Sequence, residues 1–510
     1  MKTSLILSFC LLGLSAHTTF SQRVKDSVPM PRSFSNPVVI AIPDTVVNWD
    51  SKTGFGDVNI TFYVVENNTG KSISIVDPSG KNLTPNHTKI TGKMHVRGDA
   101  TIKQPKKQFA VTLDKEPNDK HFLGMPNNGR HWVFNDCGTF DVTLMRNVIT
   151  FDAQTKMGQY APHYKWFELF LCQPTSSITA MDNILDSNYY GLYLNFDKIT
   201  FEKDRVADPS KKQLKNGDYA LIQVNQLEPT KYDELSWKNA PAAPAEVYEP
   251  KRGDLKKKKY ANAFQTIDDW YTNWAAPSDT IFTNYINAAT KRADTLGLHK
   301  LLMKVRNSTD YQSFATYFLI NELSKDQDGY HKSTFMIKKD NTCFAGPLWD
   351  KNKSYGNTWI APPTLDTTTQ KMDSLYNIKP EGWLFQDYNS ENEDANQSPQ
   401  WWSAFLLDSV YCDTVWQQWK RYKNSVLNAT YLSSLIDTQI AYISTADTLS
   451  NGGTNSALTR NNLCWQNGGN TTIEEYDAQV EQLNKYLKAR LAWMDANLKS
   501  LFAASGYVAR

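Results

Sequence analysis

The sequence lacks a large excess of charge of either sign. Its 510 residues include 55 Lys and Arg against 53 Asp and Glu, which gives a formal net charge of only +2. A dedicated nucleic-acid-binding protein would carry a strong basic excess, so we expect no nucleic acid among its partners. The length is too great for one ordinary core and predicts one large domain or two to three fused domains.

The sequence also lacks an apolar run long enough to span a bilayer, which takes about 20 residues. A shorter run from Leu5 to Leu14 follows a single lysine and precedes small and polar residues. That pattern is typical of a secretory signal peptide, which we predict over residues 1–21, with cleavage between Ala16 and Gln22. We therefore expect an exported protein without a transmembrane span, located in the periplasm, on the cell surface or outside the cell.

Cysteines are few and widely spaced. None forms a C-x-x-C pair, which excludes a zinc ribbon. One or two disulfides and a set of buried free thiols both remain open, because spacing cannot decide the pairing. The cysteines that follow the predicted signal peptide are Cys137, Cys172, Cys343, Cys412 and Cys464.

Several familiar catalytic motifs are missing. The sequence contains no Walker A loop, no G-x-S-x-G elbow, no H-E-x-x-H and no G-x-G-x-x-G. Their absence argues against P-loop, hydrolase, zincin and dinucleotide-binding proteins. Aromatic residues are abundant, and we expect most of them to fill a core. The pair Trp401-Trp402 would also suit carbohydrate binding, although a buried pair at the start of a helix is the simpler explanation.

The first part of the chain is rich in short β-branched runs, separated by Gly, Asn and Pro, which predict strands. A helical pattern follows between Phe140 and Gly158. Two more strands are then expected. The predicted strands cover residues 37–42, 58–65, 71–77, 93–99, 107–114, 165–171 and 189–199.

The rest of the chain is mainly helical by the same criteria. Residues 239–259 are rich in Pro and Ala and end in four lysines, so we predict an exposed linker there. We therefore predict an α+β protein with two lobes, an N-lobe over 91–238 and a helical C-lobe over 260–510, preceded by a β-rich segment over 22–90. The last helix carries an amphipathic stripe of Val480, Leu483, Leu487, Leu491, Met494 and Leu498.

Charged residues stand beside the predicted strands and at the ends of helices. Each one alone has an ordinary explanation, such as a turn or a solvated strand edge. Together they suit phosphoryl transfer, which needs a cation on the phosphates, a carboxylate on the attacking hydroxyl, and an oxygen ligand on Mg²⁺. A lysine from the β-rich lobe, with Asp328 and Asp350 from the second lobe, fits that division of labour.

At these residues the sequence resembles the CotH family of atypical, secreted protein kinases. The resemblance runs from about Pro37 to Leu498 and rests on six ordered blocks. It implies a two-lobed kinase-like fold with a β-rich N-lobe and a mainly helical C-lobe. The blocks are "MHVRGDAT…PKKQFAVTL", "FLGMPNNGRHWVF", "FDVTLMRN", "YYGLYLNFDKI", "LINELSKDQDGYHKSTFMIK" and "GPLWDKNKSYGN".

The resemblance also implies the cofactor, the acceptor and the site residues. The cofactor would be ATP with Mg²⁺ or Mn²⁺, or with Ca²⁺, and the acceptor a Ser or Thr of a secreted or surface protein. Asp328 falls on the family's catalytic acid, and Asp350 and Asn352 fall on its metal block. The ATP and phosphate contacts would come from Arg97, from Lys106 or Lys107, from Arg146 and from Asp197.

Three positions depart from the family pattern. Asp326 stands where Asn is usual, Asp197 replaces Glu, and Asn352 replaces the second acid of the metal block. An amide oxygen can bind Mg²⁺ but brings no charge, so metal affinity should fall. Two hypotheses follow. The protein is either a working exported kinase, or a catalytically impaired kinase-like scaffold or binding protein at the cell surface.

Overall fold

The computed structural model places most of the chain. The predicted signal peptide, residues 1–21, lies outside the described residues. The structure describes residues 28–49, 54–66, 72–77, 79, 82–98, 102, 104–115, 122–127, 129–136, 141–174, 188–225, 231–237, 244–287, 294–326, 328–357, 379–387, 398–465 and 473–509.

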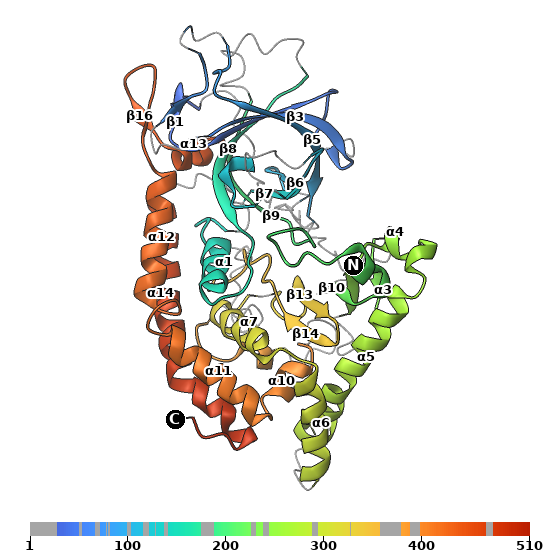
Figure 1. Cartoon of the computed structure of the whole chain (residues 1–510). Coiled ribbons are helices and arrows are strands. Elements are labelled where there is room, and N and C mark those ends of the chain that lie inside the picture. Colours follow the sequence, from blue (N-terminus) through green and yellow to red (C-terminus); the bar gives the residue numbers. More distant parts are fainter. Residues whose placement is uncertain are drawn as a thin grey trace, which may run out of the picture.

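Seven strands close into a barrel, which forms the upper part of the molecule in Figure 1. Neighbouring strands pair antiparallel, except for one parallel contact between β2 and β8. Aromatic rings fill the interior, and the rings of Phe134 and Phe167 lie 4.6 Å apart. In barrel order the strands are β2 (Val38–Pro43), β3 (Val58–Val65), β5 (Thr88–Arg97), β6 (Gln108–Leu113), β7 (His131–Asn135), β9 (Tyr189–Asp197) and β8 (Tyr164–Leu171).

The barrel crosses one predicted domain boundary. A division between residues 22–90 and 91–238 falls inside β5, which pairs with β3 on one side and β6 on the other. The earlier strands β2 and β3 complete the same closed sheet, so residues before 91 do not form a separate β-rich segment. Closure of a barrel needs every strand in the ring, because an omitted strand would leave two open edges.

A second sheet of five strands lies below the barrel, and part of it is visible in Figure 1. Strand β10 pairs with both β12 and β13, so this sheet joins the predicted N-lobe to the predicted C-lobe. In sheet order the strands are β11 (Asp233–Glu234), β12 (Ala245–Glu249), β10 (Tyr219–Val224), β13 (Thr334–Lys339) and β14 (Thr342–Ala345).

The predicted exposed linker, residues 239–259, is only partly exposed. Strand β12 lies within it and is buried at its first four residues, because Ala245, Val247 and Tyr248 pack into the main core. Helix α4 (Arg252–Leu255) follows directly. The four lysines of 256–259 are exposed, as expected of a solvated basic run.

Helices surround the second sheet. Figure 1 shows α12 and α14 along one side, α5 and α6 along the other, and α1 and α7 between them. Helix α7 is buried at 13 of its 14 residues, so it is the central helix of this part. The long helices are α1 (Arg146–Lys156), α5 (Ala263–Ile281), α6 (Thr295–Asn307), α7 (Tyr311–Ser324), α11 (Ser409–Tyr422), α12 (Ala429–Ile443) and α14 (Ile473–Asn497).

Short elements complete the described fold. The short strands are β1 (Ser33–Phe34), β4 (Ile73–Ser74), β15 (Asp447–Thr448) and β16 (Thr454–Asn455). The short α-helices are α3 (Lys211–Asn216), α9 (Leu384–Asp387), α10 (Trp401–Phe405) and α13 (Ala457–Cys464). The remaining turns of helix are η3 (Phe122–Gly124), η4 (Lys258–Tyr260), η5 (Phe282–Asn287) and η6 (Leu498–Ser505).

These elements test several sequence predictions. The α+β class is confirmed. The helix predicted between Phe140 and Gly158 begins only at Arg146. Trp401 and Trp402 are buried at a helix start, as the simpler explanation required. Among the described residues, no helix is both long and apolar enough to cross a membrane.

The described cysteines support the buried-thiol alternative. Cys172, Cys343, Cys412 and Cys464 are all free and buried, so none of these four is in a disulfide. Cys137 lies outside the described residues. Burial raises the pKa of the Cys343 thiol well above its usual value, which makes this group a poor nucleophile.

A buried ion triad fastens the C-terminal part to the barrel. Arg460 of α13 donates from Nε and Nη2 to the Glu168 carboxylate of β8 at 2.8 and 2.6 Å. The same Nη2 donates to Asp447 at 2.7 Å. All three side chains are fully buried. Asp447 in turn accepts from the backbone N–H and hydroxyl of Ser35, so the triad also holds the start of the described chain.

Replacing Arg460 with Met should destabilise the fold, because two buried carboxylates would lose their cation. We expect a loss of about 3–5 kcal/mol in the free energy of unfolding, measured by urea titration. Arg421→Met, on the exposed end of α11, is the matched control. A loss below about 1 kcal/mol for Arg460→Met would contradict a structural role for the triad.

Candidate active site

Asp328 lies in the tight turn that joins α7 to β13. Helix α7 ends at Ser324, and Lys325 follows in the left-handed conformation with φ 41°. The side chain of Asp326 then accepts the backbone N–H of Asp328 at 2.8 Å, which closes the turn. The carboxylate of Asp328 keeps 24% of its surface exposed, so it can reach a substrate.

The turn is held from behind by Glu322, which is fully buried on α7. Its carboxylate accepts the Tyr330 hydroxyl at 2.9 Å and the backbone N–H groups of Leu384 and Phe385 at 2.7 and 3.1 Å. Arg490 of α14 pairs with it at 3.2 Å. Four donors therefore fix the helix, the turn and two distant segments around one carboxylate.

The loop that carries Asp350 is held by helix α1. Asn147 donates to Asn352 Oδ1 at 2.7 Å and accepts the backbone N–H of Lys351 at 2.8 Å. Asn352 donates to Asp350 Oδ1 at 2.9 Å, so the two predicted metal ligands touch. Asp350 itself has a positive φ of 56°, a conformation that Asp tolerates better than most residues.

Arg146 supports this loop and is not open to a ligand. Its side chain is 3% exposed and forms an ion pair with Asp141. Its Nε donates to the Ser354 backbone carbonyl at 2.8 Å. The predicted Asp141, Arg146 and Asn147 block therefore positions the Asp350 loop, and the structure does not bring Arg146 to the surface of the site.

The turn and the loop meet through lysines. Lys353 Nζ lies 3.3 Å from Asp328 Oδ2, and Lys332 Nζ lies 3.9 Å from Oδ1. Burial tends to raise the pKa of Asp328, but Lys353, His331 and Lys332 lower it below its ordinary value. Asp328 is therefore a carboxylate at neutral pH, which is the form that can accept a proton.

The pKa values of the other two carboxylates, Asp350 and Asp326, are raised. Asp350 is accessible to solvent, yet the surrounding protein and the charge of Asp328 raise its pKa, against the influence of Arg97. Asp326 is fully buried, and desolvation raises its pKa to about 7. Lys351 opposes this rise, whereas Asp328 and Asp350 add to it.

Arg97 also belongs to this site. Its guanidinium lies 5.6 Å from the ring centroid of Trp349, the residue that precedes Asp350 in the chain. It donates to Gln108 at 3.3 Å, and its charge lowers the pKa of Asp350. The structure thus brings Arg97, Asp328, Asp350 and Asn352 together, and their predicted roles stay predictions.

The two predicted phosphate lysines are engaged elsewhere. Lys106 Nζ donates to the carbonyls of Asp136 and Leu192 at 3.0 and 2.7 Å, and to Asn461 at 2.9 Å. Gly191 makes room for this contact, because a Cβ there would lie 2.8 Å from Asn461 Oδ1. Lys107 Nζ binds the backbone carbonyls of residues 102 and 104 at 3.2 and 2.6 Å.

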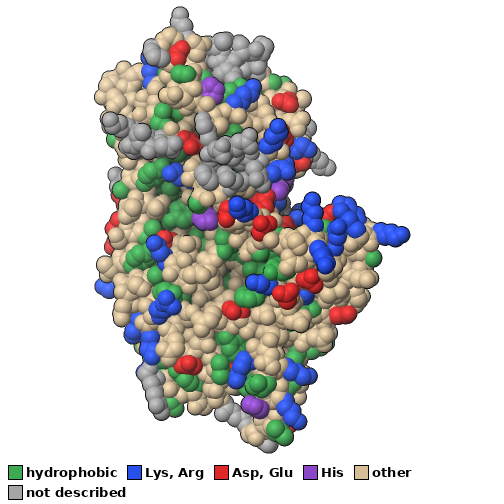
Figure 2. All heavy atoms as spheres, viewed as in Figure 1, with side chains coloured by type: hydrophobic (Ala, Val, Ile, Leu, Met, Phe, Trp, Pro, Cys, Tyr) green, Lys and Arg blue, Asp and Glu red, His purple; other side chains and the backbone are tan. Residues whose placement is uncertain are grey.

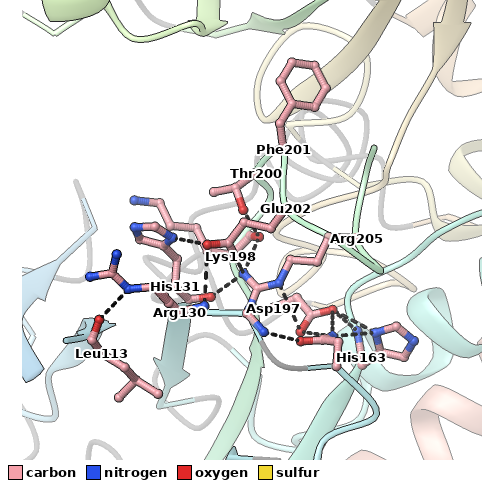
Figure 3. A network of polar contacts seen from close by, with 12 residues as sticks. Leu113, Arg130, His131, His163, Asp197, Lys198, Thr200, Phe201, Glu202 and Arg205 are labelled. Atoms are coloured by element: carbon pink, nitrogen blue, oxygen red, sulfur yellow. Dashed lines mark hydrogen bonds and ion pairs between the residues drawn. The ribbon is translucent and has the colours of Figure 1, made fainter. Parts of the chain in front are cut away.

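Asp197 also lies in a different network, shown in Figure 3. It is fully buried and accepts from Asn127, Tyr160 and His163. Arg205 lies between Asp197 and Glu202 in Figure 3, at 3.9 and 2.8 Å from their carboxylates. The structure therefore does not join Asp197 to the Asp328–Asp350 pair.

Sequence reasoning missed the lysines of the site. Lys353 stands three residues after Asp350 in the same block, and Lys332 stands four after Asp328. The closeness of these lysines in sequence to predicted acids was an available signal. The direction in which their side chains point could not be predicted, because the ion pair forms only when the loop and the turn meet.

The site offers oxygen ligands suited to a divalent cation. Asp350 supplies a solvent-accessible carboxylate and Asn352 an amide oxygen, while Asp326 Oδ2 is buried with no hydrogen-bond partner among the described residues. Those residues contain no group of three or more His, Cys, Asp and Glu that could hold an ion alone. The set fits Mg²⁺, which usually takes one or two protein carboxylates and completes its shell with water and phosphate.

An α+β protein with two facing acidic loops is thus the class that the fold and site define. A family model described as CotH kinase protein matches residues 94–494, from within β5 to within α14. Because the match covers most of the chain, the protein belongs to the CotH kinase family, and the predicted resemblance is confirmed. No curated protein matches the chain.

The raised pKa of Asp326 predicts a pH-dependent stability. An unfolded aspartate has a pKa of about 3.9, and the folded value is about 7. The folded state binds this proton more tightly, so its stabilisation is complete below about pH 4 and is lost as the pH rises through about 7. Asp326→Asn should remove this loss and gain stability over the wild type at pH 8, by as much as about 4 kcal/mol.

Urea unfolding at pH 5, 6, 7 and 8 measures the difference between the two proteins. Asp437→Asn, at an exposed position of α12, is the control for removing one surface charge. A difference between Asp326→Asn and the wild type that stays constant from pH 5 to pH 8 would disprove the raised pKa.

Proposed function

We propose that this protein is an exported kinase that transfers the γ-phosphate of ATP to a Ser or Thr of a secreted or surface protein. The single observation that carries the proposal is the ion pair between Lys353 and Asp328, at 3.3 Å, which joins the two acidic loops. It sets a carboxylate of lowered pKa beside Asp350, whose pKa is raised. Such divergent carboxylates suit two different roles, base and metal ligand.

Asp328 acts as the base in this mechanism. It accepts a hydrogen bond from the acceptor hydroxyl and takes its proton as the hydroxyl oxygen bonds to the γ-phosphorus. The bond between that phosphorus and the bridging oxygen of ADP breaks, and the electron pair leaves with ADP. Lys353 restrains the Asp328 carboxylate, and Arg97 with Lys353 supplies positive charge for the phosphoryl group.

Asp350 and Asn352 would hold the divalent cation, Mg²⁺ or Mn²⁺, or alternatively Ca²⁺. When bound, the ion neutralises phosphate charge and fixes the triphosphate. Asn147 orients Asn352 and positions the loop. Lys106, Lys107, Arg146 and Asp197 act through the scaffold in this proposal, because their charged groups already bind protein atoms.

The two lobes of the proposed kinase correspond to the barrel and the helical part. The sheet of β10 and β13 joins them, because β10 comes from the first part of the chain and β13 follows the Asp328 turn. Nucleotide would bind between Arg97, at the end of β5, and the Asp350 loop. Export by the predicted signal peptide would place the enzyme in the periplasm, on the surface or outside the cell.

A binding protein without catalysis is the second candidate. Asn352 motivates it, because an amide brings no charge to the metal, and so does the full engagement of Lys106. A thermal-shift titration with ATP and Mg²⁺ separates the two. A saturable rise in the melting temperature with ATP and Mg²⁺ favours the kinase, and no such rise favours the scaffold.

Asp328→Asn should lower phosphate transfer by about 10²–10⁴-fold, because the base is lost while the turn keeps its shape. Incubation of purified protein with labelled ATP, Mg²⁺ and an acceptor protein measures the rate. The control is again Asp437→Asn, which removes one acid far from the site. Transfer at the wild-type rate by Asp328→Asn would refute Asp328 as the base.

Asn352→Asp should strengthen metal binding, since it adds a charge beside Asp350. Without metal, the two adjacent carboxylates should repel and lower the melting temperature. With Mg²⁺ and ATP the melting temperature should rise more than in the wild type, and half-maximal activity should need several-fold less Mg²⁺. Asn451→Asp, in the exposed β15–β16 hairpin, is the control, and an equal Mg²⁺ response in all three proteins would contradict the assignment.

A further inference from the structure

A row of aromatic rings leads away from Asp350 across the second sheet. The rings of Trp349 and Phe335 lie 6.5 Å apart, Phe335 and Tyr248 lie 5.2 Å apart, and Tyr248 and Tyr232 lie 5.2 Å apart. Each end of the row carries a cation over a ring. Arg97 lies 5.6 Å from the Trp349 centroid at the catalytic end.

Lys251 lies over the outer end of the row. Its Nζ is 3.7 Å from the centroid of Tyr248 and 5.6 Å from that of Tyr232. The carboxylate of Glu249 lies 3.7 Å from Lys251 Nζ and also accepts the backbone N–H of Phe201 at 2.7 Å. This bond ties the segment after β9 to the last residue of β12.

Lys198 stands in the segment that Glu249 ties down and is half-buried. Its ammonium group makes no hydrogen bond or ion pair within the described part of the chain. Burial and the charges of Lys251 and Arg97 lower its pKa to about 8, although Glu249 and Glu202 oppose the shift. Lys198, Lys251 and Arg97 thus lie close enough for their charges to repel, an arrangement that an anionic ligand would stabilise.

The row of cations continues onto the surface. Lysines 256–259 follow Lys251 after four residues and are exposed, and within the described part of the chain Lys257 is the one of these four with a close acidic partner, Asp254. Helix α3 lies against η4 and adds the exposed Lys211 and Lys212. Figure 2 shows Lys and Arg side chains gathered on the shoulder where Figure 1 places α4.

We propose that this track, which consists of Arg97, Lys198, Lys251 and the exposed lysines 256–259, binds an acidic segment of the protein that accepts phosphate. The inference rests on the proposed function, because Arg97, at one end of the track, lies over Trp349 beside the candidate metal ligand Asp350. An extended peptide sets alternate side chains about 7 Å apart on one face, so its acids can follow cations along a surface. The rings of Trp349, Phe335 and Tyr248 are buried beneath the track, so they hold Arg97 and Lys251 in place while the cations make the contact with the peptide.

ATP is the less suitable occupant. A single triphosphate needs its charges beside the metal ligands, whereas the track continues past Tyr248 to lysines on the outer surface. A long polyanion, such as an acidic peptide, can contact cations along the whole length of the track. Charge attraction of this kind also speeds association and selects partners.

The first test measures binding without turnover. A fluorescein-labelled peptide of glutamates around one serine is compared by anisotropy with a peptide in which glutamine replaces glutamate. The glutamate peptide should bind about tenfold more tightly at low salt and weaken as salt rises. The double variant Lys198→Gln, Lys251→Gln should lose this preference, while Lys300→Gln, at an exposed position of α6, keeps it.

Equal binding of the two peptides, or an unchanged preference in the double variant, would overturn the inference. A heparin fragment of matched charge that binds more tightly than the glutamate peptide would assign the track to a sulfated polysaccharide instead. Circular dichroism and the melting temperature verify that the double variant is folded.

The second test separates this inference from the proposed function. In steady-state assays the double variant should raise KM for the glutamate peptide about tenfold, with KM for ATP as the internal reference. A rise in KM for ATP with unchanged peptide binding would make the track a nucleotide site. If the glutamate peptide binds but receives no phosphate from the wild type, the proposed kinase activity fails and the acidic-peptide site stands.

Discussion

The candidate site depends on one buried carboxylate. Glu322 sits beneath the Asp328 turn and gathers Tyr330, two backbone N–H groups of α9 and Arg490 around it. Removing a carboxylate from water is costly unless its lone pairs are satisfied, and here four donors satisfy them. The donors come from the turn, from residues 384–385 and from α14, so parts of the chain more than 100 residues apart share a single point of attachment.

Three aspartates lie close together in this site, and nearby lysines offset their mutual repulsion. Repulsion between like charges and desolvation both raise the pKa values of the three aspartates. Lysines from the same loops lower these pKa values, but not equally at each aspartate. Lys353 holds Asp328 ionised, while Asp326 and Asp350 are left with raised pKa values. The result is a site with one ready acceptor of protons and two carboxylates that gain from a nearby cation.

Much of this arrangement follows from the sequence, and the limits are physical. Short β-branched runs between turn residues identified most barrel strands, since their pattern is local. The closure of the barrel is not local, so the border placed at residue 90 fell inside β5. Likewise β12 was hidden in a segment rich in Pro and Ala, because its burial depends on pairing with β10.

The sequence named the residues of the candidate site to a similar degree, and their roles stay predictions. Asp328, Asp350 and Asn352 could be named because they stand in ordered blocks, and Arg97 because it ends a strand. The directions in which long side chains point could not be predicted from the sequence. Lys106 looked like Lys107 in the sequence, yet its amine turns inward to two carbonyls and Asn461, a residue more than 300 positions away.

The contacts between the ends of the chain have a consequence for folding. Ser35 bonds to Asp447, and Asn455 donates to the carbonyl of Pro29, while Arg460 bonds to Glu168 of the barrel. These contacts join residues 292 to 426 positions apart. The barrel strands themselves all lie between Val38 and Asp197, so the sheet can close early in synthesis. Glu168 and the segment around Ser35, however, stay without these partners until the last hundred residues have been made, and contacts of such long range form slowly.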